Sequence, residues 1–162
     1  MRYHRFAIQV VLLITISGCA ALHLSGNDSG EYVSKIGQAT GGDIDEMVPR
    51  ILRENDFELY RVEQRGRGKY FETYWLERPL LEDEESIEGV SESRTRIKIT
   101  TNIAPSSFNT TYYNVTFLAE NQFKNNSDGT WGSGKITDMA ERRLYNLERD
   151  FRMRMTEGTR RY

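Results

Sequence analysis

Hydrophobic residues recur with a helical period just after residue 43. The positions that share one face of a helix predicted near 44–55 are Ile44, Met47, Val48, Ile51 and Leu52. Asp43 followed three residues later by Glu46 is typical of a helix N-terminus, with Asp43 as the N-cap. Pro49 is tolerated in a first turn but not in a helix interior, so a start nearer Val48 is the alternative.

A second helical period covers residues 136–155, near the C-terminus. Its apolar stripe consists of Ile136, Ala140, Leu144, Leu147, Phe151 and Met155. Arginines occupy much of the remaining surface, which we interpret as a solvated basic face. The pattern therefore predicts a helix that packs its apolar stripe on a core, followed by a short basic tail at 158–162.

Between the two helices the pattern alternates, as it does in half-buried strands. Residues 57–64 and 69–78 flank the turn sequence Arg65-Gly66-Arg67-Gly68 and predict a hairpin. Residues 89–101 and 111–117 predict two further strands, and the first of these contains the clearest alternation in the chain. We interpret the acidic segment 80–88 and the Gly-rich segment 125–134 as solvated loops.

The order helix, four strands, helix predicts an α+β fold. Short connections favour an antiparallel sheet of about four strands, with both helices packed on one face. We assign this single domain to residues 43–157. Residues 19–42 are polar and Gly-rich, so we expect a flexible tether there, in which only a short strand around 31–36 is an option.

The chain begins with the parts of an export signal. Arg2 and Arg5 precede an apolar run over 6–16, which is too short to span a bilayer core. The segment Ile16-Ser17-Gly18-Cys19 resembles the lipobox of bacterial lipoproteins. That resemblance implies removal of residues 1–18, a thioether-linked diacylglycerol on Cys19 and fatty acylation, as with palmitate, of its freed amine. Ala20 in place of Asp resembles an outer-membrane address, on the periplasmic side.

Cysteine usage weighs against the alternatives to a lipid anchor. Cys19 is the only cysteine, so an exported domain cannot form an internal disulfide. Its single thiol would be left over, and acylation explains why it is there. Asn-x-Ser/Thr sequences, which would suit an ordinary secreted glycoprotein, are a weak pattern in turns rich in Asn and Thr.

Charge and residue types exclude several functions. Loss of Arg2 and Arg5 with the signal leaves 20 basic against 24 acidic residues, and this balance predicts no nucleic-acid partner. The only histidines are His4, within the signal, and His23, within the tether. We therefore expect no histidine triad, no cysteine nucleophile, no metal site and no cofactor apart from the covalent lipid on Cys19. The chain is predicted not to be an enzyme.

Two other candidate chemistries have simpler explanations. A paired-carboxylate site could join Glu72 or Glu77 to Asp83 or Glu85, but such acids are usually surface charges. The segment from Gly129 to Lys135 has the G-x-x-x-x-G-K spacing of a phosphate-binding loop. However, Ile136 stands where that motif needs Ser or Thr, and no apolar strand precedes the segment. We interpret it as a flexible, chemically inert loop.

The candidate partner-binding residues lie on two predicted strands. Arg94, Arg96 and Lys98 form a basic strip, which either discourages edge pairing or contacts an acidic ligand or protein patch. On the neighbouring strand, alternation places Tyr70 and Tyr74 on one side, and Phe71 and Trp75 on the other. One of these aromatic pairs should enter the core, and the other could form an interface.

The opening Cys19-Ala20-Ala21-Leu22-His23-Leu24 and the element order after it resemble the lipopolysaccharide-assembly lipoproteins. In that family a small α/β domain plugs a β-barrel partner, so the resemblance implies a role in an envelope complex. The sequence therefore favours a membrane-anchored, non-enzymatic accessory or scaffold subunit. The alternative is a carrier that holds a lipid or polysaccharide between the helices and the sheet, and such a carrier requires a continuous apolar cavity.

Overall fold

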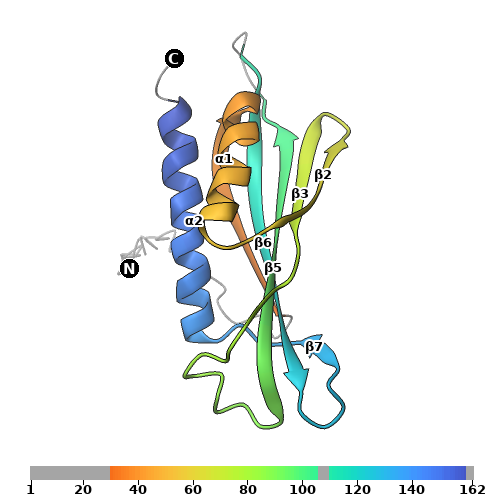
Figure 1. Cartoon of the computed structure of the whole chain (residues 1–162). Coiled ribbons are helices and arrows are strands. Elements are labelled where there is room, and N and C mark those ends of the chain that lie inside the picture. The colour runs from red at the N-terminus through yellow and green to blue at the C-terminus, as the bar shows by residue number, and fades with distance from the viewer. Residues whose placement is uncertain (1–29, 106–109, 160–162) are drawn as a thin grey trace, which may run out of the picture.

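A computed structural model describes residues 30–105 and 110–159 (Figure 1). Its elements, in chain order, are β1 (Glu31–Thr40), α1 (Gly41–Glu54), β2 (Leu59–Arg65), β3 (Gly68–Thr73), β4 (Leu76–Arg78), β5 (Val90–Ile103), β6 (Tyr112–Asn125), β7 (Trp131–Ser133) and α2 (Asp138–Thr159). The strands form one antiparallel sheet in the order β1-β6-β5-β3-β2, with β4 paired to β5 and β7 paired to β6. The α+β class is confirmed, but the sheet has seven strands rather than about four.

Strand β1 accounts for part of the difference, because residues 31–40 were expected to belong to the tether. They pair with β6 from Glu31 opposite Glu120 to Thr40 opposite Tyr112, and they bury Ile36 and Ala39. The register shifts between Lys35 and Gly37. This bulge places two apolar residues three positions apart on the same sheet face, so strict alternation could not reveal the strand. The rest of the expected tether before residue 30, including Cys19, lies outside the described residues.

Helix α1 begins earlier than either start that the sequence suggested. Thr40 is the N-cap: its hydroxyl accepts a hydrogen bond from the Asp43 backbone N–H at 3.2 Å, and the Asp43 carboxylate in turn accepts from Thr40. Asp43 is therefore the third residue of a capping box rather than the cap itself. Pro49 lies inside the helix, so the alternative start near Val48 is wrong.

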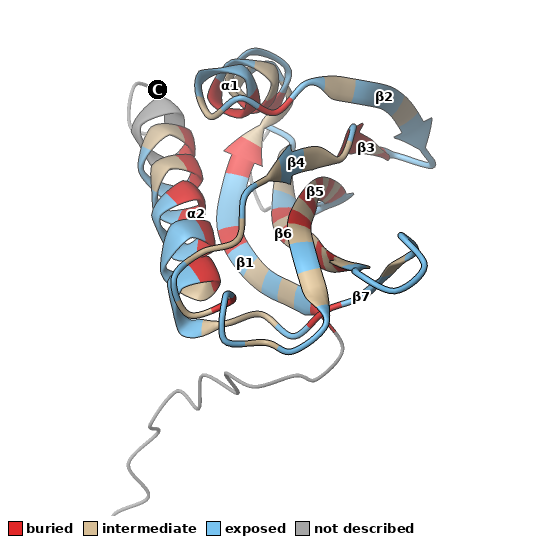
Figure 2. Ribbon diagram, turned by 60° about the horizontal axis from the view of Figure 1, so that its bottom comes forward, coloured by how far each residue is buried: buried red, intermediate tan, exposed pale blue. Residues whose placement is uncertain are grey.

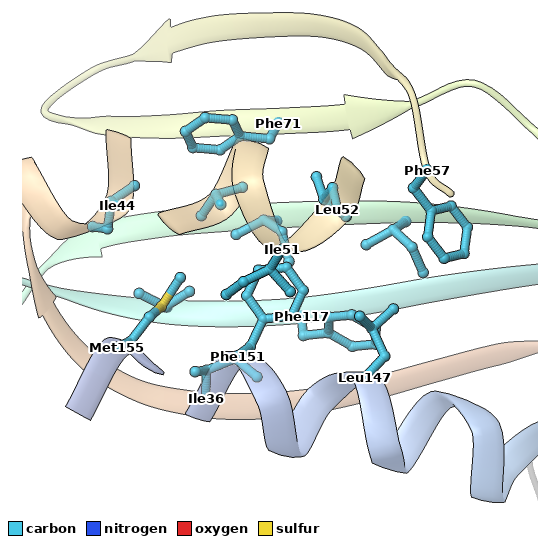
Figure 3. Close-up of a cluster of buried hydrophobic side chains, with 14 of the residues drawn as sticks. Ile36, Ile44, Ile51, Leu52, Phe57, Phe71, Phe117, Leu147, Phe151 and Met155 are labelled. Carbon is cyan, nitrogen blue, oxygen red and sulfur yellow. The ribbon is translucent and has the colours of Figure 1, made fainter. Parts of the chain in front are cut away.

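One hydrophobic core fills the space between the helices and the sheet (Figure 3). Both helices and the inner side of the strands contribute to it. Among its most buried members are Ile44, Val48, Ile51, Leu52, Phe71, Ile97, Ile99, Val115, Phe117, Phe151 and Met155. In Figure 2 the buried side of α2 faces the sheet and its exposed side faces outward. The stripe predicted for the second helix is thus confirmed as a core-facing stripe, although the helix starts at Asp138 rather than 136.

Helix α2 is also fixed to β1 by a polar contact. Glu148 is buried and accepts a hydrogen bond from the Tyr32 hydroxyl. Arg152, one turn later, pairs with Glu148 at 2.5 Å and donates to the backbone carbonyl of Ile36 at 3.1 Å. Arg152 is therefore not a purely solvated residue of the basic face. None of the helices in the described ranges is long and apolar enough to cross a membrane.

The acidic segment 80–88 is folded onto the domain instead of being a solvated loop. Glu84 is 0% exposed and receives two hydrogen bonds from Arg78, at 2.5 and 2.7 Å, and one from the Leu81 backbone N–H at 2.8 Å. The Asp83 carboxylate accepts from the Met139 N–H at 2.8 Å, in the first turn of α2. A carboxylate is favourable at this position because helix N-termini carry unpaired N–H groups and a partial positive charge.

The Gly-rich segment 125–134 is a β-hairpin turn and a strand, not a flexible loop. Asn125 and Thr130 close the turn with a backbone hydrogen bond of 2.8 Å, and β7 then pairs with the end of β6. Lys135 lies three residues before α2 begins, whereas a phosphate-binding loop leads directly into its helix. The backbone here is engaged with β6, so the geometry supports the conclusion that the G-x-x-x-x-G-K spacing is incidental.

Candidate functional site

The sheet face that points away from α1 and α2, which we call the open face, carries the predicted basic strip. Thr95, Ile97 and Ile99 of β5 are buried on the helix side. Arg94, Arg96 and Lys98 alternate with them and are partly exposed on the open face. The alternation predicted for this strand is therefore confirmed, because both of its neighbours keep it in one register.

A break between β3 and β4 decides where the aromatic residues lie. After Glu72 the ladder with β5 is interrupted for three residues, Thr73, Tyr74 and Trp75, and pairing resumes at Leu76. The Thr73 hydroxyl accepts the Ile97 backbone N–H at 3.0 Å in place of a main-chain carbonyl. As a result Phe71 enters the core while Trp75 packs on the open face, so the expectation that both lie on one side is wrong.

Trp75 and Trp131 enclose the guanidinium group of Arg94. Its central carbon lies 4.6 Å from the Trp75 ring centre and 4.2 Å from that of Trp131, within the range of cation–π contacts. The Arg94 Nε and Nη2 atoms donate to the side-chain oxygen of Gln122 at 2.9 and 2.6 Å. Trp131 was missed by sequence reasoning, because it follows the polar, Gly-rich turn and its position opposite Lys124 depends on the hairpin.

Arg94 differs from its neighbours because it forms no close ion pair within the described ranges. Glu77 of β4 lies opposite it in the sheet register, but the oxygen that Arg94 contacts at hydrogen-bond distance belongs to the neutral amide of Gln122. Burial lowers the pKa of its guanidinium, and the nearby Arg96 acts in the same direction, whereas Glu77 opposes the shift. Arg94 is therefore a partly desolvated cation whose charge is balanced only in part, by Glu77 at longer range.

Arg96 and Lys98 are instead neutralised by acids from neighbouring strands. Arg96 lies 2.9 Å from a Glu72 oxygen and 2.5 Å from a Glu120 oxygen, and Lys98 also pairs with Glu120. Burial disfavours ionisation of Glu120, but the hydrogen bonds from Lys98 and Arg96 outweigh it and hold the pKa of Glu120 below its usual value. The basic strip is therefore an internal ion-pair network, except at Arg94.

Tyr70 and Tyr74 lie in different environments. Tyr70 is buried beneath Arg65 and Arg61, whose guanidinium carbons lie 3.5 and 5.2 Å from its ring centre. Tyr74 is 52% exposed and stacks edge-on against Tyr60, with the ring centres 5.0 Å apart. Of the seven candidate residues, the structure brings Trp75, Arg94, Arg96 and Lys98 together on the open face. It covers Tyr70 with arginines, buries Phe71 in the core and leaves Tyr74 exposed against Tyr60.

The proposed pairing of Glu72 with Asp83 does not form. Glu72 is 3% exposed and is held on the open face by Arg61 and Arg96, at 2.6 and 2.9 Å, whereas Asp83 contacts the start of α2. In the part of the chain that the structure describes, no three His, Cys, Asp or Glu side chains are grouped so that they could hold a metal ion. The dominant local chemistry is therefore stacking and hydrogen bonding around Arg94.

No protein-family model matches the sequence, and the comparison with curated proteins gives no significant match. The geometry of the open face is consequently the main structural guide to function.

Proposed function

We propose that this chain is a lipid-anchored lipoprotein of the bacterial envelope that acts as a non-enzymatic accessory or scaffold subunit and docks through its open face. The anchor rests on the lipobox at Ile16–Cys19, and Ala20 favours the periplasmic side of the outer membrane. The observation that carries the docking surface is the Trp75–Arg94–Trp131 stack. Trp and Arg are among the residues that contribute most to protein interfaces.

The stack suits a protein partner for an energetic reason. The two indole rings and Gln122 already hold Arg94 in one conformation and partly desolvate it, so binding would lose little additional side-chain entropy or hydration. Its charge, which Glu77 balances only at longer range, favours a partner carboxylate. This proposal requires neither a cofactor nor nucleic acid.

The carrier alternative is less well supported. Buried side chains from both helices and from the inner face of the sheet pack against one another in the space where a carrier would hold a lipid or polysaccharide chain.

Two experiments test the proposal. Cys19→Ser should abolish acyl labelling and move the protein out of the mature membrane-bound pool, and a wild-type protein that carries no lipid by mass spectrometry would overturn the anchor. For docking, a photo-crosslinking amino acid at Tyr74, the exposed residue that precedes Trp75 in the chain, should give a discrete adduct in intact cells. The same amino acid at Tyr145, a half-exposed aromatic of α2, serves as the matched control.

The Tyr74 adduct should disappear when Arg94→Ala or Trp131→Ala is introduced, and it should persist with an alanine at Tyr145. Interface residues of this kind typically contribute about 2 kcal/mol or more, or roughly 30-fold in affinity. An adduct that forms only from position 145, or one that survives both substitutions at the stack, would contradict docking through the open face.

A further inference from the structure

A pocket of about 170 Å³ lies between the end of α1, the first half of α2 and the sheet. It begins where the close-packed core ends, beside Phe57 and Leu147, which lie at the right-hand end of the cluster in Figure 3. Leu76 of β4 and Leu144 of α2 complete its apolar wall. The helix side of the sheet is therefore not filled completely.

One of the polar residues that line this pocket is Asn121, a residue of β6 on the helix side of the sheet. Asn121 is 2% exposed, and its side-chain oxygen accepts hydrogen bonds from the hydroxyls of Ser93 and Thr95 at 3.2 and 3.1 Å. Its amide nitrogen Nδ2 has no hydrogen-bond partner among the residues that the structure describes. Buried side-chain amides nearly always have partners on both atoms, so an unused donor in a pocket wall indicates a missing acceptor.

We propose that this pocket binds the end of a small amphiphile, whose oxygen accepts a hydrogen bond from Asn121 Nδ2 and whose apolar body lies against Phe57, Leu76, Leu144 and Leu147. The volume is close to that of an engineered protein cavity of about 150 Å³ that holds benzene, which sets the body at about six to eight heavy atoms. Charges of both signs also line the pocket, from Glu54, Asp56, Arg78 and Arg143. A neutral carbonyl therefore suits the site better than a carboxylate or an amine.

Such a carbonyl could belong to a free small molecule or to the acyl ester of a membrane lipid. The two share the same chemistry at Asn121, namely an sp² oxygen on an apolar chain. Ordered water is the competing occupant, because water could also accept from Nδ2. The site does not depend on the docking role proposed for the open face, which lies on the other side of the sheet.

The test uses two ligands of nearly the same shape, cyclohexanone and methylenecyclohexane, which differ in a carbonyl oxygen against a CH₂ group. Each is titrated into the full chain in lipid nanodiscs, while NMR follows the leucine methyl groups and the Asn121 side-chain amide. Cyclohexanone should shift the resonances of Leu144, Leu147 and the Asn121 amide in a saturable manner. Methylenecyclohexane should bind about three- to tenfold more weakly, which corresponds to one neutral hydrogen bond.

Ala140→Leu is the matched variant, because Ala140 lines the pocket and a larger side chain there would occupy it. The variant should lose the saturable shifts while retaining the dispersed spectrum of a folded protein. Equal binding by this variant would place the ligand elsewhere, and the absence of shifts in the wild-type protein would leave water as the only occupant. Either result overturns the site, and equal affinity for both ligands overturns the role of Asn121 without requiring any variant.

Replacing ester-linked by ether-linked lipids in the nanodiscs distinguishes the two sources, because ether lipids lack the acyl carbonyl. If the natural ligand is a lipid ester, the Asn121 amide resonance should differ between the two membranes before any titration. An identical resonance, together with cyclohexanone binding, assigns the site to a free small ligand.

Discussion

Replacing Arg78 by methionine should leave Glu84 as an unpaired acid inside the domain. Glu84 is 0% exposed, the Arg78 side chain is 9% exposed, and two of the three hydrogen bonds that Glu84 accepts come from Arg78. Breaking a buried ion pair by removal of one partner costs about 3–5 kcal/mol. A domain of this size has a total stability of only about 5–15 kcal/mol, so the change should lower Tm by roughly 10–20 °C.

The double variant Arg78→Met/Glu84→Leu separates the cost of an unpaired charge from the cost of losing packing. Apolar replacement of both members of a buried pair is often close to neutral. Urea denaturation of the wild-type protein, both single variants and the double variant should therefore show a double variant that is more stable than Arg78→Met alone. If Arg78→Met costs less than about 1 kcal/mol, as at an exposed ion pair, the assignment of segment 80–88 as an interior anchor is wrong.

Three further outcomes are expected. Phe151→Ala should lower the free energy of unfolding in urea by about 3–5 kcal/mol, since Phe151 is fully buried between α2 and the sheet. Arg149→Ala, at an exposed position of the same helix, should change it by no more than about 0.5 kcal/mol. Equal effects would mean that the stripe does not face the core. Burial opposes ionisation of Glu148, but hydrogen bonds from Tyr32 and Arg152 hold its pKa below the ordinary value of 4.5. The contribution of Glu148 to stability is therefore complete above about pH 4.5, and it is lost as the pH falls through the lower pKa of the folded state. Glu148→Gln should therefore flatten the acid side of the Tm profile, and an unchanged profile would contradict this linkage. Gly68→Ala should destabilise the domain by about 1–3 kcal/mol in thermal denaturation, because a Cβ there would collide with the backbone carbonyl of Thr101. Gly132→Ala, where an added Cβ meets no atom within 4 Å and φ is not positive, serves as the control for the loss of a glycine. A wild-type Tm for Gly68→Ala would refute that close approach.

The features that the sequence alone determined are those with a regular local period. The 3.6-residue stripes of the two helices and the alternation of residues 94–101 identified the core-facing sides correctly, because each depends only on the geometry of one element. The hairpin around Gly66 was also predictable: Gly66 has φ +59°, a backbone conformation that favours glycine, in a two-residue turn. The lipid anchor at Cys19 stays a prediction from sequence, since it lies outside the described residues.

The tertiary structure decided every feature that depends on a neighbouring strand or on an interrupted period. Pairing with β6 placed β1 in the sheet despite the bulge after Lys35, and the break after Glu72 moved Trp75 away from the side of Phe71. Carboxylates on neighbouring strands pair with Arg96 and Lys98, whereas Arg94 donates its hydrogen bonds to a neutral amide and has Glu77 opposite it only at longer range. Contacts between residues that are distant in sequence or separated by a turn decide three further features. These are the burial of Glu84, the position of the Trp75–Arg94–Trp131 stack and the unpaired donor of Asn121. A local pattern gives the direction of a side chain from its own backbone, whereas its partners and its solvation are set by the strands and helices that pack beside it.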